Sequence, residues 1–160
     1  MPVADTATHP FTGFNFAVEI RVPDVTTRVC DAAFAECDGL EMTMEVKTVK
    51  EGGNNAQLHR LAGPLAFGTL TLKRGLTATY DLWDWFARIV ERPSLRADGE
   101  VVLLAPDRST ERARFVIRRC LPVKLKAPAL NARDGAVAIE ELQLAYESLT
   151  LKRPSGGTSA

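Results

Sequence analysis

The sequence predicts a β-rich globular protein made of antiparallel strands with one helix. Apolar and polar residues alternate along most of its segments, which is typical of strands with one face on a core and the other in water. One segment instead follows the helical period. The chain has 160 residues, of which 46% are hydrophobic and 25% are charged. These values suit one domain with its own core and exclude general disorder.

The alternation recurs in five segments, and in each we expect the apolar side chains to face the core. Charged residues stand between them, which a parallel sheet buried on both faces would not tolerate. The phase slips near Glu140 and Glu141 and again near Ser148, so a bulge or bend is expected at each place. The alternating apolar positions are Phe14, Phe16, Val18 and Ile20; Met42, Met44 and Val46; Leu70 and Leu72; Phe115 and Ile117; and Leu142, Leu144 and Tyr146.

A helix is predicted between Thr79 and Pro93. Either Thr79 or Asp81 can cap its start, and Pro93 ends it. Trp83 lies off the apolar stripe, which leaves open both a protein interface and packing at the rim of the helix. The stripe predicts that the helix covers one face of a sheet, and it consists of Leu82, Trp85, Phe86, Ile89 and Val90.

A long excursion separates two of the strand segments. Residues 50–55 lead into residues 57–61, which exceeds the usual hairpin loop of about 2–5 residues. Polar segments that project are commonly used for contacts. A second long connection is expected from Pro122 to Gly135. The candidate contact residues of the excursion are Lys50, Glu51, Gly52, Gly53, Asn54, Asn55, His59 and Arg60.

The charge balance argues against a dedicated nucleic-acid binder. Lys and Arg number 20 and Asp and Glu number 20, so there is no excess of cations to neutralise phosphates. No apolar run approaches the roughly 20 residues of a membrane helix, and residues 1–11 lack a secretory signal, so we expect cytoplasmic synthesis. One basic cluster without interleaved aromatic residues favours a solvated or interface face, and it comprises Arg112, Arg114, Arg118, Arg119, Lys124 and Lys126.

Motifs for catalysis or cofactor binding are missing from the sequence. It contains no GxGxxG, P-loop, GxSxG or HExxH pattern. Glu36 and Asp38 share a strand face, but solvated surface carboxylates are the commoner explanation. The histidines are His9 and His59, and their spacing from the cysteines favours neither a Cys–His nucleophile nor a zinc site. We therefore expect a binding or structural module without enzyme activity, metal or cofactor, in which three cysteines stay reduced: Cys30, Cys37 and Cys120.

Several short motifs follow one another along the chain. They are Phe14-Asn15-Phe16, Phe34 through Cys37-Asp38-Gly39-Leu40, Glu45 to Gly53, Leu61-Ala62-Gly63-Pro64, Leu70-Thr71-Leu72-Lys73-Arg74-Gly75, Leu82-Trp83-Asp84-Trp85-Phe86 and Val137-Ala138-Ile139-Glu140-Glu141-Leu142. In this order and spacing the chain resembles the inner tube (tail tube) protein of contractile injection systems and contractile phage tails. The resemblance covers roughly residues 14–152.

The resemblance implies a mainly β (α+β) fold of two packed antiparallel sheets in a barrel-like sandwich, with one flanking α-helix and a long protruding hairpin. It implies a structural subunit that forms stacked hexameric rings of a hollow tube inside a contractile sheath, without catalysis. The implied partners are further copies of the chain, a sheath protein, baseplate and cap components, and cargo in the lumen. The excursion at residues 50–60 would be the hairpin that reaches the next ring, and the assembled particle would be an extracellular particle or virion.

Three segments are expected: an N-terminal arm at residues 1–13, the tube-protein β-sandwich at residues 14–153, and a flexible C-terminal tail at residues 154–160. The two extensions leave open a variant role, as a tube initiator in the baseplate or as a component of a mixed tube. An alternative from another class is a soluble β-barrel that binds a small ligand, with Trp83 and the sheet forming a pocket.

Overall fold

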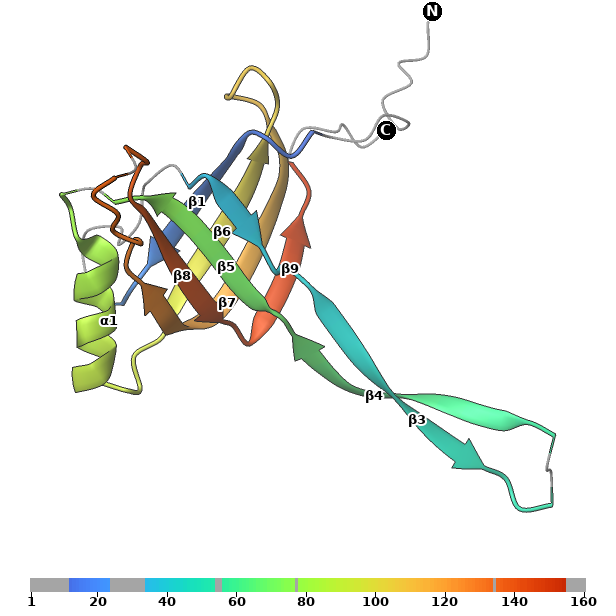
Figure 1. Ribbon diagram of the computed structural model, residues 1–160. Helices are drawn as coiled ribbons and strands as arrows, with labels where there is room; N and C mark the ends of the chain where they lie inside the picture. The colour runs from blue at the N-terminus through green and yellow to red at the C-terminus, as the bar shows by residue number, and fades with distance from the viewer. Residues whose placement is uncertain (1–11, 24–33, 54–55, 77, 134, 155–160) are drawn as a thin grey trace, which may run out of the picture.

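The computed structural model describes residues 12–23, 34–53, 56–76, 78–133 and 135–154. Within them, two antiparallel sheets share one long strand, β7 (Glu111–Lys126) (Figure 1). Sheet A, as we name it, orders β1 (Phe16–Arg21), β6 (Ala97–Leu104), the first part of β7 and β9 (Ser148–Lys152). Sheet B orders the last part of β7, β8 (Ile139–Ala145), β5 (Thr69–Gly75) and β2 (Glu36–Asp38).

Strand β7 passes from one sheet to the other at Arg119. Residues up to Cys120 pair with β6, and residues from Leu121 onward pair with β8. Arg119 has a positive φ of 52°, and a bulge follows between Pro122 and Lys124. Bulges of this kind let a strand bend between sheets and tolerate a proline that cannot donate to the ladder. The second long connection predicted from Pro122 is therefore wrong at its start, because the strand continues to Lys126.

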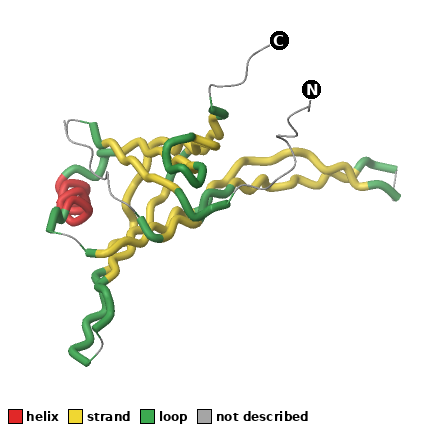
Figure 2. Tube along the Cα trace, turned by 90° about the horizontal axis from the view of Figure 1, so that it is seen from above, coloured by secondary structure: helices red, strands yellow, loops and turns green. Residues whose placement is uncertain are grey.

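The protruding hairpin consists of β3 (Met42–Lys50) and β4 (Leu58–Phe67), which pair only with each other among the described strands. It extends away from the two sheets, and helix α1 (Asp81–Glu91) lies at the other end of the molecule (Figures 1 and 2). The predicted sandwich-like fold with one helix is confirmed, although the described strands do not close into a barrel.

The core lies between the inner faces of the two sheets and the helix. Val18 and Ile20 from β1 and Ile117 from β7 meet the side chains of sheet B. On sheet B the apolar positions predicted from alternation are fully buried: Leu70, Leu72, Leu142 and Leu144. The predicted helical stripe supplies Leu82, Trp85 and Ile89, which are buried, and Phe86, which is half-buried. Each large side chain of this kind stabilises the fold by roughly 1.5–3 kcal/mol.

Some predictions at the ends of elements are wrong. Phe14 is exposed, whereas Asn15 is buried and its Nδ2 donates to the carbonyl oxygen of Ala105 at 3.3 Å. Val90 is 70% exposed because the helix ends one residue later and its last turn passes beyond the core. The N-cap residue is Tyr80, in a left-handed conformation, rather than Thr79 or Asp81.

The predicted phase slip in β8 is also wrong, although the predicted bend near Ser148 is confirmed. Strand β8 alternates without a bulge against β5, because Glu140 occupies an inward position beside Leu142 and is 1% exposed. The bend lies at Glu147, between β8 and β9. No helix in the described ranges is long and apolar enough to cross a membrane.

Candidate assembly surfaces

The hairpin continues two neighbouring strands of sheet B. β3 follows β2 after Gly39, Leu40 and Glu41, and β4 runs into β5 through Gly68. Gly39 has φ +103°, and a Cβ atom there would lie 2.0 Å from the carbonyl oxygen of Thr69, so only glycine fits. The buried Tyr146 fastens this base, because its hydroxyl donates to the Gly39 carbonyl at 2.7 Å and accepts from the Glu41 amide at 3.0 Å. The hairpin therefore has a defined exit from the body.

The half of the hairpin next to the body has one apolar face that is uncovered in the single chain. Alternation and the register of the β3–β4 pair place five exposed side chains on this face, which we call the apolar ribbon face: Met42, Met44, Val46, Ala62 and Leu65. Phe67 begins the same face but packs against the core, and toward the tip the face becomes polar with Thr48 and Arg60. Met44 is 53% exposed and Leu65 is 46% exposed. Soluble proteins rarely leave contiguous apolar surface uncovered unless it binds a partner.

The prediction that Met42, Met44 and Val46 face a core is wrong within one chain. All of β3 is exposed, because the ribbon has no second layer to pack against. The opposite face is mixed, with Lys47 and His59 among its side chains. The difference between the two faces is the feature that indicates function. The sequence shows it in the alternation of residues 42–46, although that alternation alone predicts a face on the core.

The predicted contact residues gather at the tip of the hairpin. Lys50 and Arg60 belong to β3 and β4, and the Nε2 of His59 lies 3.3 Å from Oε2 of Glu51. Gly52 and Gly53 form the turn, the latter at φ +98°. All six of these residues are exposed, and the other two predicted residues, Asn54 and Asn55, lie outside the described residues.

A buried cluster of charges holds the helix to sheet B. The guanidinium of Arg74, on β5, is 2% exposed; its Nε donates to Oε1 of Glu140 at 2.6 Å, and it also pairs with Asp81 at the start of α1. Trp83 donates from Nε1 to Oε2 of Glu140 at 3.1 Å. The Arg74 guanidinium stacks over the ring of Phe34, 5.6 Å from its centroid. Trp83 thus packs at the rim of the helix, one of the two predicted possibilities.

The outer face of sheet A carries several ion pairs between neighbouring strands. Arg114 pairs with Glu111 at 2.8 Å and with Glu100, and Arg118 pairs with Asp98 at 3.0 Å. The Arg114 guanidinium donates to Glu111 and lowers the pKa of that carboxyl. Much of the predicted basic cluster is therefore matched by acids on neighbouring strands, with Arg119 paired to Glu147 at 2.7 Å.

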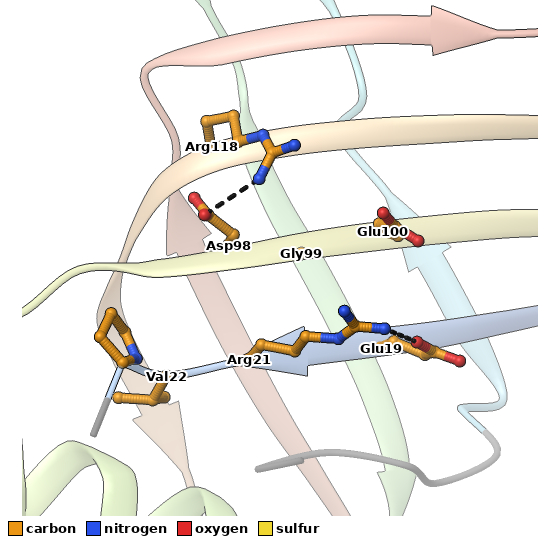
Figure 3. Close-up of a pocket in the computed structure, with 8 residues that line it drawn as sticks. Glu19, Arg21, Val22, Asp98, Gly99, Glu100 and Arg118 are labelled. Atoms are coloured by element: carbon orange, nitrogen blue, oxygen red, sulfur yellow. Dashed lines mark hydrogen bonds and ion pairs between the residues drawn. The ribbon is translucent and has the colours of Figure 1, made fainter. Parts of the chain in front are cut away.

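An open hollow of about 300 Å³ lies over β1 and β6 on this face (Figure 3). Its charged side chains already pair with one another: Arg21 with Glu19 at 3.3 Å, and Arg118 with Asp98. The interior between the sheets is filled by the core, and Trp83 binds Glu140 rather than lining a pocket with the sheet. Among the described residues, Trp83 and the sheet therefore do not form the pocket that the small-ligand alternative predicted.

The two described cysteines are protonated structural groups. Burial raises the pKa of the Cys120 thiol to about 12, and burial together with the charge of Asp38 raises that of Cys37 to about 11. Both are free thiols, and no group of three metal-binding side chains occurs in the described ranges. Cys30 and His9 lie outside the described residues.

A chain that exposes an apolar ribbon on a well-packed sandwich is a subunit of a larger protein assembly. Comparison with known proteins identifies the kind of assembly to which it belongs. Residues 12–150 match the family model described as T4-like virus tail tube protein gp19, so the chain belongs to that family. It is a structural tube subunit of a contractile injection system. No curated protein sequence gives a significant match.

Solved structures share this fold. The fold matches a chain of the anti-feeding prophage baseplate, solved with 6-fold symmetry, with a TM-score of 0.80 and 27% identity over 91% of this chain and 97% of that one. It matches a chain of the PVC extracellular contractile injection system sheath-tube complex with a TM-score of 0.77 and 17% identity, over 92% and 95%. Hcp1 from Flavobacterium johnsoniae shares the fold at a TM-score of 0.51 and 11% identity, over 86% and 96%.

Proposed function

We propose that this chain forms hexameric rings that stack into the hollow inner tube of a phage-tail-like particle. The observation that supports this proposal is the projecting hairpin with its uncovered apolar ribbon face, in a chain of the tail tube family. A rigid body that presents an apolar arm at one end can only bury it on another molecule. A contact between two different surfaces of identical chains repeats, and so generates rings and filaments.

In this arrangement the apolar ribbon face packs on a neighbouring copy, and the polar tip, Lys50 to Gly53 with His59 and Arg60, contacts the next ring. Residues 14–153 form the tube-protein domain. The surrounding partners are a sheath protein outside the tube, baseplate and cap components at its ends, and cargo within the lumen. The subunit is synthesised and assembled in the cytoplasm, leaves the cell only as part of the particle, and acts mechanically rather than as an enzyme.

Electron microscopy of the full-length protein, alone and with its sheath partner, tests the proposal. Rings or rods are expected; a strictly monomeric species at every concentration and with the sheath partner would contradict it. Deleting Gly52 to Gln57 should spare the folded subunit and abolish stacking, since the body keeps its core. Arg108→Gly, at a different exposed turn where φ is already positive, is the matched control and should leave stacking intact.

A second candidate within the same assembly is the tube initiator of the baseplate. It is favoured by the 27% identity to a chain of the anti-feeding prophage baseplate structure, against 17% to the sheath-tube complex. Quantitative mass spectrometry of purified particles separates the two roles. A main tube subunit should rise in copy number with particle length, whereas an initiator should stay at one ring in particles of every length.

A further inference from the structure

The middle of the hairpin contains a β-bulge. The register of the β3–β4 pair shifts between Met44 and Val46. Two residues of β4, Gly63 and Pro64, there lie opposite the single residue Glu45 of β3. A Cβ atom on Gly63 would lie 2.5 Å from the Glu45 carbonyl oxygen, which is too close for a side chain. Pro64 has no N–H group to donate, and bulges are places where a strand tolerates such a residue. The Gly63-Pro64 pair therefore fixes the bulge at this place.

The hairpin turns over along its length. A bulge bends its strand and increases the right-handed twist of the pair, and two-stranded ribbons already twist more than wide sheets. Figure 1 shows β3 and β4 crossing about midway along the hairpin, so that the two strands exchange sides between the base and the tip. The face of the ribbon that is turned toward the viewer in one half is therefore turned away in the other half.

The apolar residues also change face in the middle of the hairpin. Next to the body they lie on the apolar ribbon face, which becomes polar beyond the bulge. In the outer half, the opposite face carries Val49 and Leu61, which are 45% and 54% exposed. The register makes these two residues diagonal neighbours on that face, which they share with Lys47 and His59. The outer half thus has its own small apolar patch on the other face of the strands.

These two changes compensate each other. Because the ribbon turns over and the apolar residues change face in the same region, Val49 and Leu61 point to the same side of the molecule as the apolar ribbon face. Leu58, the other large apolar residue of the outer half, pairs with Lys50 on the opposite face and points the other way. A flat ribbon of the same sequence would present its two apolar sets to opposite sides.

We propose that the hairpin presents one continuous apolar side to a second copy of this chain, and that the Gly63-Pro64 bulge aligns its two halves. The apolar ribbon face forms the inner half of this apolar side, and Val49 and Leu61 form its outer half. All of β3 is exposed, so no other element of the described chain covers it. The inference rests on the proposed function, in which a neighbouring copy covers the apolar ribbon face, and it continues that contact past the bulge toward the tip.

Two leucines of β4 offer a matched test of the apolar side. Leu61 and Leu58 are both exposed and lie three residues apart on opposite faces of the hairpin. Leu61→Ser should reduce the formation of rings and rods at least tenfold, measured by sedimentation and electron microscopy. Leu58→Ser loses the same side chain and should assemble as the wild type does. Equal assembly of the two variants overturns the one-sided contact.

Deleting Pro64 tests the bulge. Gly63 alone then opposes Glu45 and the flanking pairs keep their partners, so both apolar sets stay on their present strand faces. Assembly should still fall at least tenfold, because the added twist is lost. Pro64→Ala keeps the extra residue and is the control, expected to assemble as the wild type does. Circular dichroism and thermal unfolding check that each variant folds. Equal assembly of the two Pro64 variants overturns the role of the bulge.

The outcomes separate this inference from the proposed function. Wild-type chain that never forms rings or rods overturns both. Leu61→Ser rods in the wild-type amount overturn the continuous apolar side and leave the tube standing. Leu61→Ser chain that assembles alone but no longer binds the sheath protein also overturns the proposal, since the sheath then covers this side. Loss of assembly in Leu61→Ser and in the Pro64 deletion, with both controls intact, supports it.

Discussion

The sandwich and the hairpin use the same alternation of apolar and polar residues with opposite results. In the sandwich, Leu70 and Leu72 are fully buried because a second sheet covers them. In the hairpin, Met42, Met44 and Val46 follow the same rule, yet all three are exposed because nothing in the chain lies above them. The alternation thus indicates that one face of the strand is to be buried. It does not indicate whether the covering layer belongs to the same chain or to another one.

The largest expected effect lies in the sandwich. Replacing Arg74 by Met leaves Glu140 as an unpaired charge that is 1% exposed, and breaking a buried pair in this way costs about 3–5 kcal/mol of unfolding free energy. Urea denaturation followed by circular dichroism measures it. Lys73→Met, on the same strand with an exposed partner, is the control and should change the stability little. Equal losses in the two variants would contradict a special role for the buried cluster.

The hairpin should respond in the opposite way. Met44→Ser with Leu65→Ser changes two exposed side chains, so the unfolding free energy should stay within about 0.5 kcal/mol of the wild type. Tube formation should fall at least tenfold, by sedimentation and electron microscopy, because the apolar ribbon face has lost its centre. Thr43→Ser with Lys47→Ser alters the opposite face of the same ribbon, away from the tip, and should leave tube formation intact. If both variants assembled equally well, the apolar face would not be the contact.

Tyr146 joins the two regions, and its loss should be intermediate. Tyr146→Phe keeps the ring beside Phe67, whose centroid lies 5.7 Å away, but removes the hydroxyl from Gly39 and Glu41. We expect a loss of about 1–2 kcal/mol. Hydrogen exchange should accelerate at residues 39–44 while the β8–β5 pairing stays protected. Uniform acceleration over both regions would show that Tyr146 serves the whole core rather than the base of the hairpin.

The smallest effect concerns the turn between β6 and β7. Asp107 accepts hydrogen bonds from Thr110 and Ser109, which lower the pKa of its carboxyl. A lowered folded-state pKa gives stability that is present above the unfolded value near 3.9 and is lost as the pH falls through the folded one. Asp107→Asn should remove a slight part of the pH dependence below about pH 4 in thermal melts. A larger change near neutral pH would contradict this assignment.

The elements with a clear period could be predicted from the sequence. Leu82, Trp85 and Ile89 define the buried side of α1, and Leu142 and Leu144 define that of β8. Both patterns are local, and each depends only on one periodic face meeting a core. The unusual length of the excursion also predicted a projecting segment, and the structure places its residues at the tip of the β3–β4 hairpin. Their contact with the next ring stays a prediction.

The remaining features depend on contacts distant in sequence. Glu140 seemed to break the alternation of its strand, because its partner Arg74 lies 66 residues away and meets it only when β5 pairs with β8. Pro122 seemed to end a strand, but the bulge in β7 accommodates it. The ion pair between Glu36 and Lys73 can be recognised only once β2 and β5 are placed in register.

A hairpin of only two strands is marginally stable in water. In the lone chain the ribbon is fixed at its base by Tyr146 and Gly39, and docking must supply the rest of its order. When the first few copies associate, each must order its hairpin before a complete docking surface exists, so these first steps are unfavourable. We therefore expect nucleated growth, with a lag that preformed seeds abolish, so that the number of seeds governs how many tubes a cell makes.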